Sequence, residues 1–125
     1  MIKNAKYKAI QFFIRQKQLN KKSKIYKSCK SILRTDKFTI DYNNAIKCLN
    51  NIDFIYDTIN NHWAETDGKS ISINLYKTYT DRLLLNTLIH EAMHYIIHRT
   101  GIYTKHEVYE AKEHKIMYLT NRCLI

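Results

Sequence analysis

Five consecutive residues carry the clearest chemistry in this sequence, His90-Glu91-Ala92-Met93-His94. In a helix, side chains four residues apart lie one turn above each other, so both imidazoles can bind one Zn²⁺ at about 2.0–2.1 Å. Zinc lowers the pKa of a bound water toward neutrality, and Glu91 can take the proton of that water before the hydroxide attacks a peptide carbonyl. The spacing therefore predicts two zinc ligands and a general base within one turn of helix.

A catalytic zinc takes three protein ligands, so one more residue is needed. His98 would lie too far away on a continuous helix, because the eight residues from His90 rise about 12 Å. We therefore expect the third ligand beyond Gly101. The candidates are His106, Glu107, Glu110 and His114.

The element that must position the motif is a long, densely apolar helix from about Arg82 to Thr100. Thr80 or Asp81 can cap its start, and Gly101 is a suitable residue to follow its end. Such a helix should be the central and most buried one. A last helix, from about Glu107 to Asn121, should pack across it and supply the third ligand.

The remaining elements are read from periodicity and turn residues. Residues 43–62 carry apolar side chains at helical spacing, which favours a helix or a helix pair. Asp67-Gly68 predicts a hairpin between Trp63 and Leu75, and the alternation over residues 70–75 is typical of a half-buried strand. The predicted fold class is α+β, with helices packed on a short β-hairpin or small sheet around the central motif helix.

Positive charge is concentrated in the first third of the chain. Residues 1–37 hold twelve Lys and Arg against one acid, whereas residues 38–125 hold nine basic and ten acidic residues. Apolar spacing within this basic segment predicts two amphipathic helices broken near Leu19-Asn20. The segment is either a solvated helical surface or a contact for DNA or RNA, with an anionic membrane surface as a third possibility.

Length and composition restrict the remaining possibilities. The chain has 125 residues, which suits one domain, and no apolar run reaches the roughly 18 residues of a membrane span. The N-terminus lacks the features of a signal peptide, so we expect an intracellular protein. The three cysteines are odd in number and far apart, which predicts buried, reduced thiols rather than a disulfide framework.

Two stretches together resemble the SprT-like zincin metallopeptidases: residues 70–75 and the run Asn86-Thr87-Leu88-Ile89-His90-Glu91-Ala92-Met93-His94. The resemblance covers residues 63–119, and we take residues 63–121 as the catalytic core. It implies a small zincin-like metalloprotease domain in which His90, His94 and His106 bind zinc and Glu91 is the general base. It also implies protein substrates associated with nucleic acid, reached through the basic residues 1–37.

Two alternatives stay open. The stretch from His90 to His98 is also similar to the ImmA/IrrE-like peptidases, which cleave repressors and in which Glu110 would be the third ligand. In the other alternative, zinc or ordinary packing only holds together a nucleic-acid-binding module without catalysis. For the SprT-like peptidase, the substrate would lie extended beside the strand at residues 71–75 if that strand is a sheet edge.

Overall fold

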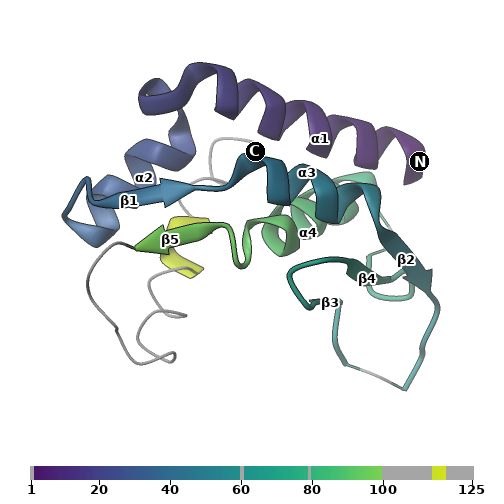
Figure 1. The fold of residues 1–125 in the computed structure, drawn as a ribbon. Coiled ribbons are helices and arrows are strands. Elements are labelled where there is room, and N and C mark those ends of the chain that lie inside the picture. Colours follow the sequence, from purple (N-terminus) through teal and green to yellow (C-terminus); the bar gives the residue numbers. More distant parts are fainter. Residues whose placement is uncertain (1, 60, 79, 100–113, 118–125) are drawn as a thin grey trace.

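The computed structural model describes residues 2–59, 61–78, 80–99 and 114–117, and it has an α+β architecture (Figure 1). The helical elements are α1 (Ile2–Leu19), the short 3₁₀ turn η1 (Asn20–Lys22), α2 (Lys24–Leu33), α3 (Tyr42–Asn50) and α4 (Asp81–Met93). The strands are β1 (Phe38–Ile40), β2 (Ile52–Ile55), β3 (Ala64–Thr66), β4 (Ile71–Asn74) and β5 (Ile97–Arg99). Residues 114–117 are also helical.

Helix α1 lies across α3 and α4 and closes one side of the core (Figure 1). Its inward face carries Ala5, Ala9 and Phe13, all buried. The small side chains of the two alanines let the helix backbones approach closely, whereas the larger Phe13 fills space in the core. Leu88 and Ile89 of α4 are fully buried in the same core, so α4 is central, as the sequence predicts.

The two amphipathic helices predicted at the N-terminus are confirmed as α1 and α2. Asn20 has φ +50, which interrupts the first helix at the position where the apolar spacing breaks. Ser23 caps the second helix, because its hydroxyl accepts a hydrogen bond of 3.0 Å from the backbone N–H of Tyr26. Arg34, with φ +54, ends it.

Two small sheets lie toward opposite ends of the helical layer (Figure 1). Strands β1 and β5 form an antiparallel pair, and the other sheet has the order β2-β4-β3. The predicted hairpin is confirmed as β3 and β4, joined through Gly68 at φ +86. The Asp67 carboxylate stabilises this turn by accepting from the backbone N–H groups of Lys69 and Ser70 at 2.8 and 2.9 Å.

The interpretation of residues 43–62 as one helix or a helix pair is wrong in its second half. Helix α3 ends at Asn50, and Ile52–Ile55 forms β2, parallel to β4. The apolar residues there fit a helical spacing, but backbone hydrogen bonding to β4 decides the conformation. The pairing also makes β4 a central strand, so the condition for a substrate beside it, a free sheet edge, is not met.

The motif helix is shorter than predicted. It begins after Thr80, whose hydroxyl accepts from the backbone N–H of Leu83, and it ends at Met93 rather than Thr100. Tyr95 has φ +66, which turns the chain out of the helix, and Ile97–Arg99 then pairs with β1. His98 therefore lies on a strand opposite Thr39, and its position is not set by the rise of a helix from His90.

Two of the three cysteines, Cys29 and Cys48, are buried free thiols, as predicted; Cys123 lies outside the described residues. The predicted helix over residues 107–121 is described only at residues 114–117. Among the helices of the described ranges, none combines the length and apolar character needed to cross a membrane.

Candidate metal centre

Three histidines converge at the end of α4. His90 lies in the last turn of the helix, His94 is the residue that caps its C-terminus, and His114 comes from the helical residues 114–117. Their ring centroids lie 5.1 Å (His90–His94), 5.4 Å (His90–His114) and 5.6 Å (His94–His114) apart. One ligand atom from each ring lies within 4.8 Å of the others, so the three imidazoles can hold one metal ion.

The placement of His94 depends on how the chain leaves the helix. The backbone N–H of His94 donates to the carbonyl of Glu91 at 3.2 Å, and the left-handed Tyr95 follows. The Tyr95 ring lies against Gly68, where a Cβ atom would be 3.4 Å from it. The Asn44 side chain donates to the Gly68 carbonyl at 3.2 Å. Helix α3 and the β3–β4 turn thus support the backbone next to the second ligand.

The electrostatics of the cluster keep His90 available as a ligand. Burial lowers the pKa of His90 to about 4, and the neighbouring His94 and His114 contribute to this shift. A metal binds the neutral imidazole, so His90 has no proton to lose near neutral pH. His90 and His94 are half-buried, whereas His114 is exposed, which leaves one side of the cluster open to solvent.

Glu91 is half-buried next to the cluster. Burial raises the pKa of its carboxyl, His94 lowers it, and Glu65 on β3 raises it again. A carboxylate with a raised pKa is a better proton acceptor than a fully solvated one. This environment makes Glu91 a candidate general base.

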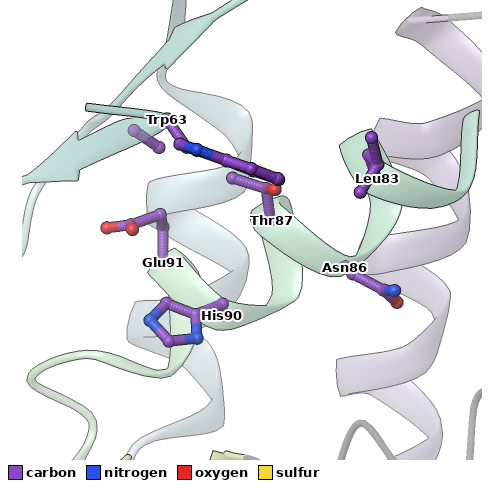
Figure 2. Close-up of a pocket in the computed structure, with 7 residues that line it drawn as sticks. Trp63, Leu83, Asn86, Thr87, His90 and Glu91 are labelled. Carbon is purple, nitrogen blue, oxygen red and sulfur yellow. The ribbon is translucent and has the colours of Figure 1, made fainter. Parts of the chain in front are cut away.

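A hollow of about 300 Å³ opens beside His90 and Glu91. In Figure 2 the indole of Trp63 lies beside Thr87, and Glu91 and His90 project from the next turn of α4. Leu83 and Asn86 complete the far end of the same hollow. The space is mainly apolar at one end and carries the histidine and carboxylate at the other, an arrangement typical of a binding site.

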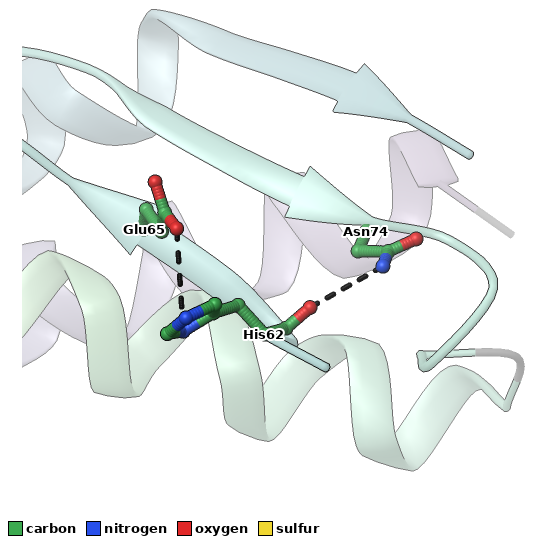
Figure 3. Close-up of polar contacts among 3 residues, drawn as sticks. All are labelled: His62, Glu65 and Asn74. Carbon is green, nitrogen blue, oxygen red and sulfur yellow. Dashed lines mark hydrogen bonds and ion pairs between the residues drawn. The ribbon is translucent and has the colours of Figure 1, made fainter. Parts of the chain in front are cut away.

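Asn74 holds the segment that presents Trp63. This side chain is 1% exposed, and its amide donates to the carbonyls of Asp57 and His62 at 2.9 and 3.3 Å. Its oxygen accepts from the backbone N–H groups of Asp57 and Tyr76. His62 also pairs with Glu65 at 4.0 Å (Figure 3). The connection between β2 and β3 is therefore fixed at the point where it enters the hollow.

The predicted site residues have different outcomes. The structure brings His90, His94 and Glu91 together, and it adds His114, one of the four candidates for the third ligand. His106, Glu107 and Glu110 lie outside the described residues. The hollow was not predicted from the sequence, although Leu83, Thr87 and Glu91 repeat every four residues along α4 and so indicate a shared face.

Comparison with known proteins adds no relative. No protein-family model matches the chain, and no curated protein or solved structure does so either. The SprT-like and ImmA/IrrE-like resemblances therefore stay predictions from the sequence.

Proposed function

We propose that this protein is a zinc-dependent peptidase of the SprT-like type. The observation that carries the proposal is the convergence of His90, His94 and His114, with Glu91 beside them at the mouth of a hollow. Among the described residues, three protein nitrogens meet there. Three protein ligands and an open position are the arrangement of catalytic zinc, whereas structural zinc is closed by four protein ligands.

The residues fit the metal by their chemistry and by their spacing. Neutral imidazole is a preferred zinc ligand, and ligand atoms within 4.8 Å of one another need only small side-chain rotations to reach a common ion. When bound, zinc would lower the pKa of a coordinated water and polarise a carbonyl. Glu91 is the residue positioned to accept a proton there and to pass it to the leaving amine.

The edge strand β3 is the best support for a peptide as the substrate. It pairs with β4 on one side, it is the outer strand of its sheet, and it packs against α4. An extended peptide added to this edge would lie beside α4 and next to the hollow, where an apolar side chain can sit against Trp63 and Leu83. The proposed position of the substrate is therefore beside β3 rather than beside β4.

The metal content of the purified protein tests the ligand set. We expect about one zinc per chain after dialysis, and almost none in His94→Ala or His114→Ala, because two ligands hold zinc weakly. His98→Ala is the matched control, since this exposed histidine lies on β5 outside the cluster. Zinc retained in His114→Ala and lost in His106→Ala would transfer the third ligand to His106.

Glu91→Gln tests catalysis separately from binding. We expect zinc to stay at one per chain while hydrolysis of a denatured protein such as casein falls by roughly 10²–10⁴-fold, the usual contribution of a general base. If zinc binds, and no hydrolysis is measurable in the wild type, the metal is structural. Equal hydrolysis by wild type and Glu91→Gln would contradict the role of this carboxylate.

A further inference from the structure

Helix α2 has one face made of basic residues. Lys24, Lys27 and Lys30 follow at intervals of three, so they lie along one side of the helix, and Arg34 is the residue that ends it. All four side chains are exposed, and the opposite side of α2 is buried through Ile25, Cys29 and Leu33. We call these four the α2 basic face. Lys21 and Lys22, also exposed, precede it in η1.

The charges on this face repel one another without compensation. Residues 1–35 contain no Asp or Glu, and like charges three or four residues apart destabilise a helix. Among the described residues, no carboxylate forms an ion pair with any of the four. An anionic partner would remove this repulsion, which is the first indication of what the face binds.

A second hollow lies beside Lys21 of η1 and Tyr26 of α2. It measures about 320 Å³ and is lined by Asn20, Lys21, Tyr26, Asp36, Phe38, Thr39, Ile40 and Tyr42. The rings of Tyr26 and Phe38 are tilted, with their centroids 5.0 Å apart. The hollow therefore offers aromatic surface and hydrogen-bonding groups, with a lysine at its rim.

The charge of Asp36 favours a base over a phosphate group of a nucleic acid in this hollow. Its carboxylate repels a phosphate, but it can accept hydrogen bonds from the amino group of a nucleobase such as cytosine. A base can enter only when it is unpaired and unstacked, as in a single strand. The size of the hollow and the aromatic rings suit a base, and the lysines outside it suit the phosphates.

We propose that the α2 basic face, with Lys21 and Lys22, binds single-stranded nucleic acid. The phosphates contact the basic side chains, and one base carrying an amino group occupies the hollow beside Asp36. This surface is independent of the metal site and does not rest on the proposed peptidase function. A membrane is a poorer partner, because the exposed side chains of α2 are Lys24, Lys27, Lys30 and Ser31, with no apolar residue to insert.

Fluorescence anisotropy with a labelled 15-nucleotide strand tests the face. The triple variant Lys24→Ala, Lys27→Ala, Lys30→Ala should bind at least about 10-fold more weakly in 0.1 M salt, and its salt slope should fall by about 2. The matched control is Lys3→Ala, Lys8→Ala, Arg15→Ala, which removes the same charge from exposed positions of α1. This control should lose less than about 3-fold. Equal losses in the two triples would overturn the assignment to α2.

Asp36→Ala tests the hollow, because repulsion of the strand and binding of a base predict opposite changes in affinity. If Asp36 only repels the strand, its removal tightens binding to every sequence, because the net charge becomes more positive. If the hollow takes a base, Asp36→Ala weakens binding of a cytosine strand by about 3-fold or more and leaves a thymine strand unchanged or tighter. Tighter binding to both strands would overturn the base site.

Two further ligands complete the test. A 15-base-pair duplex of the same sequence should bind more weakly than the single strand, since its paired bases cannot enter the hollow. Vesicles containing phosphatidylserine should bind more weakly than the strand and without dependence on Asp36. A preference for the duplex or for the vesicles would overturn the proposal. Circular dichroism of each variant verifies that it is folded.

Discussion

Helix α2 has ten residues and helix α4 has thirteen, and the two differ in burial and in charge. Helix α2 has one buried face and one exposed face that is entirely polar and mostly lysine. Helix α4 is covered along much of its length by α1, α3 and the β2-β4-β3 sheet, and it carries a single acid, Glu91, beyond its first turn. A polyanion surface needs charge density and tolerates loose geometry, whereas a metal site needs three atoms placed around one point.

The difference in burial predicts the largest effect on stability. Leu88 of α4 is fully buried, so Leu88→Ala should lower the free energy of unfolding by about 3–5 kcal/mol, through lost burial and an unfilled cavity. Leu33 ends α2 and is 6% exposed, so Leu33→Ala should lower it by about 2–3 kcal/mol. Urea unfolding measures both. A larger loss at Leu33 would mean that α4 is not the central helix.

The same contrast explains why α2 was predictable from sequence and the end of α4 was not. The bounds of α2 are set locally, by the Ser23 cap and by apolar residues on one face. Ile96 and Ile97 continue the apolar spacing of α4, so this spacing predicts a longer helix than the one observed. They leave it because β5 pairs with β1, residues 38–40, far away in the sequence. A pattern that fits both helix and strand is decided by its partner.

The candidate site divides in the same way. His90, Glu91 and His94 follow from spacing within one helical turn, which a sequence contains completely. The third ligand depends on how the chain returns to α4 after twenty further residues, which no local pattern specifies. His114 could be named only as one of four candidates. Trp63 was assigned to the start of a hairpin, and its place in the hollow depends on the Asn74 contacts that hold the preceding segment.

Alkaline pH should lower the stability of the fold through a group on α2, because α4 has no group that titrates in this range. Burial raises the pKa of Cys29 from 9.0 to about 12, so between these values the unfolded chain loses a proton that the folded protein keeps. Stability therefore falls as pH rises through this range, by up to about 1.4 kcal/mol per pH unit. Helix α4 contains no Cys, Tyr or Lys. Urea midpoints at pH 8 to 11 measure the decline.

Cys29→Ala is the control for the alkaline decline, because it removes the titrating thiol. We expect a flatter pH dependence between pH 9 and 10. A smaller decline should persist, since burial also raises the pKa of the Cys48 thiol and that of Tyr42. An unchanged profile in Cys29→Ala would show that another group causes the loss of stability.

The smallest expected effect is a gain in stability on α2. Lys27 lies three residues from both Lys24 and Lys30, so Lys27→Glu replaces two repulsions by two attractions and should stabilise the fold by roughly 0.5–1 kcal/mol at low salt. Lys47→Glu on α3 is the matched control, because the positions three and four residues from it are all asparagine. It makes the same change in net charge without new pairs.

Thermal unfolding at 20 mM and 1 M NaCl measures the gain, which should shrink at high salt for Lys27→Glu. The same variant should bind single-stranded nucleic acid more weakly than the wild type. If Lys27→Glu gains stability and loses binding, the neighbouring lysines of α2 destabilise the fold but contribute to binding of a nucleic acid. An equal gain in Lys47→Glu would assign the effect to net charge, and the α2 basic face would lose this support.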